Sequence, residues 1–454
     1  MRTPHARTTG TAVRLLLALL LLAATAACGN GTSTTGPTLT MLVPWEDQSE
    51  LSAFQQVLGR FQHDYHITVR PTPTRALDQV LQTELQRGDP PDLAVLPTPG
   101  TLSHYARQNS LTPLDGLADN SIARSLPAEL RQRFGPQWYT LIEAGTQHPY
   151  AVVVKANVKS LLWYDPRRLG QPAPGTSSQL ADLDGTLSRQ RGTPWCLALA
   201  DPPNSGWPGT DWIEDILLHQ SGPRVYAQWV NGQLAWNSQP VLSAWQTWGR
   251  LAGDPAKVYG GASGALLTPY SQGDLPLFNR AGGCSLAHGA LVPNSNGTPR
   301  YRPGRDYDFF PFPPNNAAAK PSYEVAGDLL TVFRDSPAAD RFLSFMASTE
   351  AQRIWPENQP DQAFSADREV TGQLRSTYAG DRVAARIDQM LTSPDATLCF
   401  DASDSMPETM AAAFDRAVLA YLQNPGQLPA LLDRLDQVRA GAYSTDHPSF
   451  TCGT

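Results

Sequence analysis

Apolar positions follow two different periods in the first part of the chain. Residues 39–43, 67–69 and 93–96 are short apolar runs, typical of buried strands. Between them, apolar side chains recur every three or four residues, which predicts two helices built on Leu51, Phe54, Leu58, Phe61 and then on Leu77, Val80, Leu81, Leu85. Asp47 or Ser49 could cap the first helix. This βαβαβ order predicts a parallel sheet with right-handed crossovers.

Residues 150–165 form a longer strand-like run in which Lys155, Asn157 and Lys159 alternate with apolar residues. Residues 205–218 resemble a loop that runs into a helix, with Thr210 or Asp211 as its cap. The same patterns predict strands at 306–312 and 326–333, and helices at 102–108, after 337 and around 431–438.

The loops that follow the first strands carry polar and aromatic side chains. Trp45 and Glu46 follow the strand at 39–43, and Arg75 follows the strand at 67–69. Ligands of open α/β sheets bind outside the carboxyl ends of the strands. An aromatic face, a carboxylate and a guanidinium at this edge therefore predict a binding surface.

Residues 1–27 have the pattern of a secretory signal. Arg2, Arg7 and Arg14 precede an apolar run at 15–24, and small residues lead to Cys28. The run is too short to span a bilayer comfortably. A cysteine at the cleavage point resembles a bacterial lipobox, so we expect lipid on Cys28 and a flexible tether over 28–37. The alternative is an ordinary signal peptide with a chance cysteine.

Charge and size narrow the functional classes. Three of the 35 lysines and arginines precede Cys28 and no acid does, so the remaining 427 residues carry 32 basic and 42 acidic side chains, a net charge of -10. This charge argues against nucleic acid as a partner. A chain of this length favours two or more lobes. The 11 tryptophans offer stacking faces for a sugar-like ligand, although core packing explains most of them.

Four cysteines follow the predicted lipid anchor. Cys196, Cys284, Cys399 and Cys452 form an even set, which in an exported chain indicates disulfides, with three possible pairings. We favour Cys196–Cys284 and Cys399–Cys452, because each pair then stays within one segment of the chain. The sequence contains no CxxC or HExxH motif, so we expect no zinc site and no cofactor.

Several segments, in order along the chain, resemble extracellular solute-binding proteins of carbohydrate ABC transporters. The similar group is the α-glucoside-type receptors, relatives of maltose-binding protein. The segments are the lipobox-like start, Val-Pro-Trp-Glu at 43–46, Pro-Pro-Asp-Leu-Ala-Val-Leu-Pro at 90–97, Lys-Ala-Asn-Val-Lys-Ser at 155–160, Gly-Trp-Pro-Gly-Thr-Asp-Trp at 206–212, Ala-Gly-Asp-Leu-Leu at 326–330 and Phe-Asp-Ala-Ser-Asp-Ser-Met-Pro at 400–407.

The resemblance implies a two-lobed α/β fold of the periplasmic-binding-protein type, each lobe a mostly parallel sheet flanked by helices. Lobe one would comprise 38–155 and 308–355, and lobe two 157–305 and 360–454, with both disulfides in lobe two. The resemblance further implies a monomer on the outer face of the cytoplasmic membrane. It would close on a small solute, expected to be a carbohydrate, and deliver that solute to ABC permease subunits.

Five expected site residues belong to the first lobe or to the crossing between lobes. Trp45 could stack on a sugar or be a packed loop tryptophan. Glu46 could accept hydroxyl protons or be a solvated carboxylate. Arg75 could bind hydroxyls or an acidic ligand, or lie on the surface. Lys155 and Asn157 could line the cleft floor or only build the strand.

Five further residues complete the expected site. Trp207 could close over a sugar ring from the second lobe, and Asp211 could bind solute or cap its helix. Gly327 and Asp328 match the family's strand segment, where backbone could approach the ligand. Trp355 could be a second aromatic surface, although core packing is the better interpretation.

Two other functional classes remain open. An exported glycoside hydrolase needs two carboxylates across a substrate, and Asp211 with Glu214 or Asp215 offers such pairs on one helix face. Acids in a first helical turn are, however, also favoured by the helix dipole. No G-x-S-x-G or P-loop motif occurs in the sequence, so we expect no enzyme. A sensor on the same scaffold is the other alternative.

Overall fold

The computed structural model describes residues 36–170, 172–191, 193–279, 282–290, 301–359 and 363–453. The predicted signal peptide, Cys28 and most of the tether lie outside these ranges. The chain divides into two units, 1–37 and 38–454, and all that follows concerns the second. In the described part of the chain, no helix is long and apolar enough to cross a membrane.

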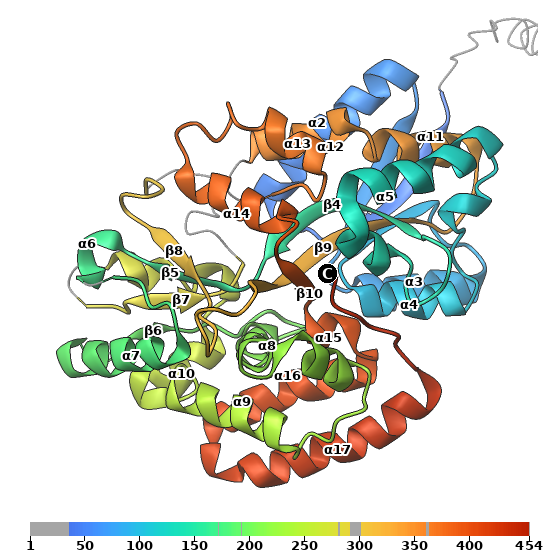
Figure 1. The fold of residues 1–454 in the computed structure, drawn as a ribbon. Coiled ribbons are helices and arrows are strands. Elements are labelled where there is room, and N and C mark those ends of the chain that lie inside the picture. The colour runs from blue at the N-terminus through green and yellow to red at the C-terminus, as the bar shows by residue number, and fades with distance from the viewer. Residues whose placement is uncertain are drawn as a thin grey trace, which may run out of the picture. The chain divides into compact units, whose positions relative to one another are not determined.

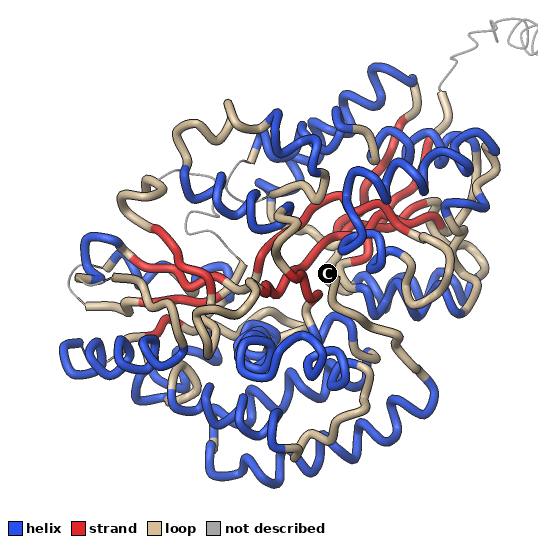
Figure 2. Tube along the Cα trace, viewed as in Figure 1, coloured by secondary structure: helices blue, strands red, loops and turns tan. Residues whose placement is uncertain are grey.

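The second unit is built of helices and strands (Figures 1 and 2). The strands are β1 Thr38–Val43, β2 Thr68–Pro73, β3 Leu93–Leu96, β4 Ala151–Val158, β5 Leu161–Tyr164, β6 Trp195–Cys196, β7 Leu286–His288, β8 Asp308–Pro311, β9 Ser322–Val332 and β10 Thr397–Phe400. The α-helices are α2 Gln48–Tyr65, α3 Leu77–Arg87, α4 Pro99–Arg107, α5 Asn120–Ile142, α6 Pro166–Leu169, α7 Ser177–Arg191, α8 Trp207–Val230, α9 Gln239–Arg250, α10 Gly261–Leu267, α11 Pro337–Met346, α12 Thr349–Asn358, α13 Arg368–Gln373, α14 Arg382–Thr392, α15 Ala402–Ser405, α16 Glu408–Gln423 and α17 Leu428–Thr445. The 3-10 helices are η1 Leu114–Gly116, η2 Pro255–Lys257, η3 Tyr270–Gln272, η4 Leu275–Phe278 and η5 Pro425–Gln427.

The first sheet contains the predicted βαβαβ unit. Its order is β10-β9-β3-β1-β2, with β4 paired to β9, and β1 runs parallel to both β2 and β3. The first helix begins as predicted, because the Asp47 side chain accepts a hydrogen bond from Ser49 N at 2.8 Å. The predicted late helices are present as α11 and α17.

The strand-like run at 150–165 is two strands in different sheets. β4 pairs with β9 of the first sheet, whereas β5 pairs with β7 and β8 of the second, whose order is β6-β7-β5-β8. The chain therefore passes between the sheets at residues 159–160. β8 belongs to the second sheet and β10 to the first, which differs from the lobe boundaries expected from the sequence.

Strand directions are mixed in both sheets. Among the described strands, three of the five pairings in the first sheet are parallel, as expected, whereas two of the three pairings in the second are antiparallel. β9 is antiparallel to β3 and β4, and β5 is antiparallel to β7 and β8. The physical reason is the passage of the chain between the sheets. β4 leads from the first sheet to the second and β9 leads back, so the two strands run in opposite directions side by side (Figure 1).

Helix α8 begins earlier than predicted, so neither Thr210 nor Asp211 is its cap. The helix starts at Trp207 with Gly206 as N-cap and Pro208 in its first turn. Gly206 has a φ of 122°, and a Cβ atom there would lie 2.6 Å from the carbonyl oxygen of Asp415. Glycine is therefore required on both counts, and it lets α8 start one turn before the polar residues that suggested a cap.

Two disulfides join the four cysteines as predicted. Cys196 at the end of β6 pairs with Cys284, and their Cα atoms are 5.2 Å apart. Cys399 in β10 pairs with Cys452, with a Cα–Cα distance of 4.4 Å. The second bond attaches the C-terminal segment to the first sheet, where Gly453 also pairs with Leu398.

A buried carboxyl group on α14 predicts a pH-dependent stability. Burial raises the pKa of Asp388 to about 6, and its recorded side-chain partner is the Thr371 hydroxyl at 3.4 Å. A folded-state pKa above the usual value of about 3.9 means that the folded chain binds this proton more tightly. Stability is therefore lost as the pH rises from about 4 through 6.

We expect Asp388→Asn to stabilise the protein by about 1–3 kcal/mol at pH 7.5 and by much less at pH 4.5. Urea denaturation at the two pH values measures this difference. Asp395→Asn, which changes an exposed carboxylate, is the matched control and should have no such effect. A loss of stability at both pH values in Asp388→Asn would contradict the prediction.

Candidate functional site

Four side chains from the two halves of the second unit meet in one polar and aromatic cluster, which we call the interlobe cluster: Arg75, Asp201, Trp207 and Tyr270. Arg75 forms an ion pair with Asp201, and the same carboxylate oxygen accepts a hydrogen bond from Trp207 Nε1 at 2.9 Å. The rings of Trp207 and Tyr270 are 5.0 Å apart at an interplanar angle of 64°. The Arg75 guanidinium lies 5.7 Å from the centre of the Tyr270 ring.

Parallel pairing of β1 and β2 brings the first-lobe residues together. Because the two strands end at the same edge, Thr74 N donates to the Val43 carbonyl at 2.9 Å. Arg75 N then donates to a Glu46 carboxylate oxygen at 3.1 Å. The strand-end interpretation of Glu46 and Arg75 thus places both at one edge of the sheet, where Glu46 is exposed and Arg75 is half-buried.

The second-lobe residues come from three segments. Asp201 follows the apolar run after β6, Trp207 opens α8, and Tyr270 opens η3. Burial lowers the pKa of the Arg75 guanidinium, but Tyr270 and Asp201 outweigh it and hold this pKa above its usual value. Arg75 is therefore a permanent cation that faces the Asp201 carboxylate and the Tyr270 ring.

Trp207 differs from every other tryptophan in its exposure. All eleven tryptophans lie within the described ranges. Ten of them are at most 3% exposed, whereas Trp207 is only partly buried. The Lys159 ammonium lies 5.0 Å from the centre of its ring. Trp207 is thus the one tryptophan that could offer part of its face to a ligand.

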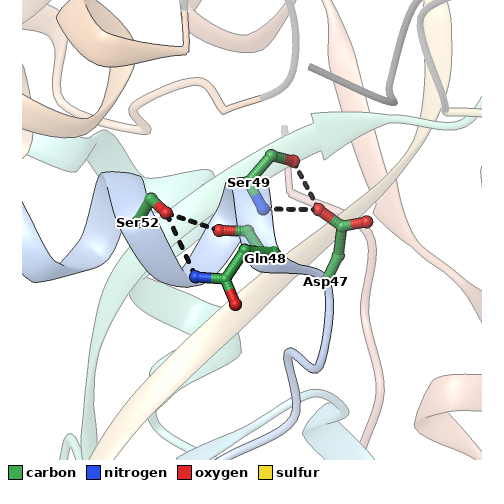
Figure 3. A pocket seen from close by; sticks show the side chains of 4 residues that line it. All are labelled: Asp47, Gln48, Ser49 and Ser52. Atoms are coloured by element: carbon green, nitrogen blue, oxygen red, sulfur yellow. Dashed lines mark hydrogen bonds between the residues drawn. The ribbon is translucent and has the colours of Figure 1, made fainter.

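A surface pocket lies next to Glu46 along the chain. It has a volume of about 330 Å3 and is lined by Asp47, Gln48, Ser49 and Ser52 at the start of α2 (Figure 3). Gln48 and Ser52 are linked to each other, since Ser52 Oγ donates to the Gln48 carbonyl at 2.6 Å. Hydroxyl, amide and carboxylate groups on one rim are suited to a polyhydroxylated ligand.

Trp45 and Trp355 are packed against each other rather than exposed. Their ring centroids are 4.7 Å apart, and Phe54 lies 5.0 Å from Trp45. Trp45 is 3% exposed and donates to Asp328 at 2.9 Å. This placement favours the alternative of packed aromatic residues over a stacking surface for both tryptophans.

Lys155 and Asp328 neutralise each other beneath this aromatic group. The Lys155 ammonium lies 3.0 Å from Asp328 and 2.7 Å from Glu50. Although burial lowers the pKa of Lys155, Asp328 and Glu50 hold it above its usual value. Their charges are therefore already paired.

Asn157 and Gly327 lie on the paired strands β4 and β9, at neighbouring register positions. Asn157 is partly buried opposite Ala326, and Gly327 lies opposite Ala156. A Cβ atom at Gly327 would lie 3.2 Å from the Trp138 ring, so close packing explains this glycine. No contact of either residue with the interlobe cluster is recorded within the described ranges.

Asp211 is buried below the interlobe cluster. It is 1% exposed and lies 3.2 Å from the Lys159 ammonium, which also pairs with Asp401. It belongs to a buried group of charges rather than to an accessible surface.

Sequence reasoning missed two members of the interlobe cluster, Asp201 and Tyr270. Asp201 had a usable signal, because it ends an apolar run at 197–200 and precedes two prolines. The rule that selected Glu46 and Arg75 would have selected it too. Tyr270 had none, since it lies in a short 3-10 helix without hydrophobic periodicity.

Comparison with known proteins identifies the family. The model of the family described as bacterial extracellular solute-binding protein matches residues 45–353. The chain belongs to this family. All four members of the interlobe cluster, from Arg75 to Tyr270, fall within the matched range.

Individual solute-binding relatives align over most of the chain. The alpha-glucosides-binding periplasmic protein AglE of Rhizobium meliloti is 30% identical over 70% of this chain and 70% of its own. The osmoprotective compounds-binding protein GgtB of Synechocystis is 29% identical over 78% and 81%. A solved chitin oligosaccharide binding protein has a TM-score of 0.72 at 15% identity, covering 90% of this chain and 99% of its own.

These findings establish the fold class and the family. The two-lobed α/β fold expected from the sequence is confirmed, because solute-binding proteins of known structure share it over nearly their whole length. Membership of an extracellular family also implies export of this chain. The relatives described above are named as binding proteins.

Proposed function

We propose that this solute-binding protein captures a carbohydrate or a related polyhydroxylated solute between two lobes and delivers it to the permease of an ABC importer. Glu46 and Arg75 would hold the solute from the lobe of the first sheet. Asp201, Trp207 and Tyr270 would hold it from the lobe of the second. Capture and delivery need no chemical step, so we propose no catalytic residue.

The observation that carries this proposal is the pairing of Arg75 with Asp201 beside the partly exposed Trp207. Sugars are held by aromatic faces against C–H groups and by planar polar groups at hydroxyls. The interlobe cluster presents both kinds of group from segments far apart in the sequence. Because its members lie on opposite lobes, a solute that contacts all of them would favour the closed state.

The neighbouring pocket supports a hydroxyl-rich solute. Asp47, Gln48, Ser49 and Ser52, which follow Glu46 along the chain, line this pocket with polar groups (Figure 3). The relatives are named for different solutes: AglE for alpha-glucosides and GgtB for osmoprotective compounds. An α-glucoside is the first solute class to test here, and compatible solutes are the second.

We further propose that lipid on Cys28 holds the protein, as a monomer, at the outer face of the cytoplasmic membrane. Cys28 follows a signal-like segment and precedes a Gly/Ser/Thr-rich stretch. A single chain without a spanning segment among its described residues needs some means of staying near a permease. Mass spectrometry of the native protein tests this point, and an unmodified Cys28 would contradict the anchor while leaving solute capture intact.

Titration calorimetry with a panel of α-glucosides, other oligosaccharides and compatible solutes tests the function. We expect saturable binding of at least one solute at a stoichiometry of one. Chromatography of the same mixtures after prolonged incubation should show unchanged solute. Hydrolysis products would contradict a binding function, and the absence of binding across the panel would contradict the carbohydrate assignment.

A further inference from the structure

Beneath the interlobe cluster lies a group of buried acids with a deficit of positive charge. Asp211 on α8, Glu324 on β9 and Asp401 directly after β10 each place a carboxylate oxygen within 4.8 Å of the other two. All three are 1% exposed or less. Oxygens bound to one Ca²⁺ at about 2.4 Å cannot lie farther apart than twice that distance. The spacing therefore fits ligands of a single ion.

Glu324 is the residue that points to a missing partner. Neither of its carboxylate oxygens has a hydrogen-bond partner within the described ranges, and the same holds for Asp211 Oδ2. Glu324 is 0% exposed, so bulk water does not satisfy it. Leaving a buried carboxylate without partners is strongly unfavourable. Three oxygens without hydrogen-bond partners, two on Glu324 and one on Asp211, thus belong to this group of acids.

The charges near these oxygens do not balance. Lys159 is the cation in contact with the group, through Asp211 at 3.2 Å and through Asp401. One lysine against three ionised carboxylates would leave two negative charges, and Asp404 lies 3.9 Å from the same ammonium. Glu214, next to them, accepts hydrogen bonds from Ala402 N and Ser403 N, so backbone donors already satisfy it.

We propose that Asp211, Glu324 and Asp401 form a site for one divalent cation of the Ca²⁺ type, with Glu324 binding through both oxygens. The ligands are all oxygens, which Ca²⁺ prefers, and Ca²⁺ tolerates irregular geometry better than Mg²⁺. A divalent cation would give the two Glu324 oxygens the partner that they lack. The search for zinc motifs in the sequence could not reveal such a site, because its ligands come from three distant segments.

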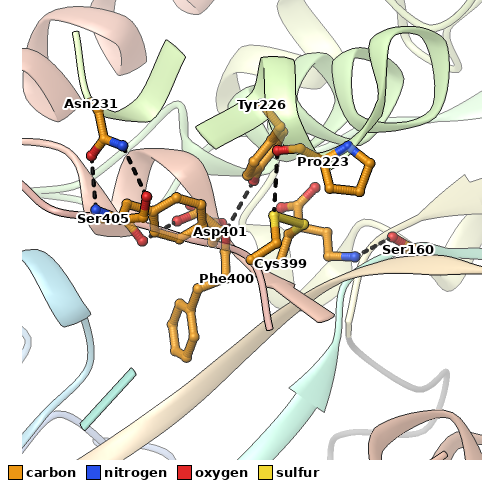
Figure 4. Close-up of a disulfide and its surroundings, with 11 residues drawn as sticks. Ser160, Pro223, Tyr226, Asn231, Cys399, Phe400, Asp401 and Ser405 are labelled. Atoms are coloured by element: carbon orange, nitrogen blue, oxygen red, sulfur yellow. Dashed lines mark hydrogen bonds between the residues drawn. A yellow bond between two sulfur atoms is a disulfide. The ribbon is translucent and has the colours of Figure 1, made fainter. Parts of the chain in front are cut away.

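The place of this site in the fold suggests its role. Lys159 lies where the chain leaves the first sheet, Glu324 lies near the start of the returning strand β9, and Asp401 lies where the chain leaves β10 for α15. Figure 4 shows this junction: Tyr226 of α8 donates to the Phe400 carbonyl at 3.0 Å, next to Asp401. A bound ion would tie α8 to the strands that connect the lobes.

Metal analysis of the purified protein tests the proposal directly. After dialysis against chelator-treated buffer, we expect binding of one Ca²⁺ per chain on titration and a rise in Tm of about 3 °C or more at millimolar Ca²⁺. Glu324→Gln keeps the shape of the side chain and should abolish both effects. Asp395→Asn, at an exposed site, should retain both.

Three outcomes would overturn the proposal. One is a metal-free protein whose Tm is unchanged by millimolar Ca²⁺, Mg²⁺ or Mn²⁺. Another is a Glu324→Gln protein that keeps the full Ca²⁺ response, which would assign that response to surface carboxylates. The last is a pair of results: Glu324→Gln is more stable than the wild type at pH 8, and neither protein responds to Ca²⁺. Together they would show that protons, not a metal ion, neutralise the acids.

Discussion

Lys159→Met lowers the free energy of unfolding by about 3–5 kcal/mol, the cost of leaving buried carboxylates without their counter-ion. Lys159 is 7% exposed, and Asp211 and Asp401 both depend on its ammonium group. Methionine has a similar length and fills the space without the charge. The shift of the urea denaturation midpoint, at an unchanged slope, measures the loss.

The pH dependence of this variant gives a second readout. Burial raises the pKa of Asp211 well above its usual value, and the loss of Lys159 removes the charge that opposes this rise. The buried acids then take up protons more readily, so the deficit of Lys159→Met should be smaller at pH 5 than at pH 8. Lys320→Met, at an exposed position, is the matched control. Equal stability of Lys159→Met and the control would contradict the prediction.

Trp207→Ala is expected to weaken solute binding by about 30-fold or more, the effect typical of a central aromatic contact. The reason is the position of this side chain, which is partly exposed, bonded to Asp201 and packed against Tyr270. The stability of the Trp207→Ala protein should change little by comparison, because the Trp207 ring is not part of the buried core. Titration calorimetry with the solute identified for the wild type measures the loss.

Tryptophan fluorescence separates Trp207 from the packed tryptophans. Trp207 is the one tryptophan of eleven that is not buried, so the change in emission on solute binding should disappear in Trp207→Phe. Trp45→Phe should keep both the emission change and an affinity close to that of the wild type, because Trp45 packs on Phe54 and Trp355. If instead the emission change disappears only in Trp45→Phe, the solute contacts Trp45 of the first lobe rather than Trp207 of the second, and the prediction is wrong.

The interlobe cluster and the buried acids Asp211, Glu324 and Asp401 form two adjacent layers, which we call the upper and the lower layer. Lys159 connects the layers, since its ammonium lies over the Trp207 ring at 5.0 Å and pairs with the buried acids on its other side. The upper layer would contact solute, and the lower layer holds together the segments that pass between the sheets. Substitutions in the lower layer should therefore change stability first, and substitutions in the upper layer should change affinity first.

Sequence patterns were sufficient wherever neighbouring residues decide the structure. The apolar periods predicted β1 to β3 and the helices between them, and Asp47, one of the two cap candidates, is the N-cap of the first helix. Strand-end reasoning placed Glu46 and Arg75 at one edge of the sheet, where Arg75 N donates to Glu46, because parallel strands bring consecutive loops together. The family resemblance correctly anticipated the two-lobed fold, and the favoured cysteine pairing is present.

The tertiary structure alone decided which polar groups meet. Trp45 and Trp207 look alike in the sequence, because each lies close to the start of a helix. In the structure Phe54 and Trp355 enclose Trp45, whereas Trp207 stays partly exposed. Lys155 and Lys159 are four residues apart in one run, but the passage of the chain between two sheets gives them different sets of acids. Local periodicity determines the elements, whereas decisive partners of a charge or a ring are distant in the sequence: Asp401 lies 242 positions from Lys159, and Asp328 lies 283 positions from Trp45. Only the packed chain brings these residues together.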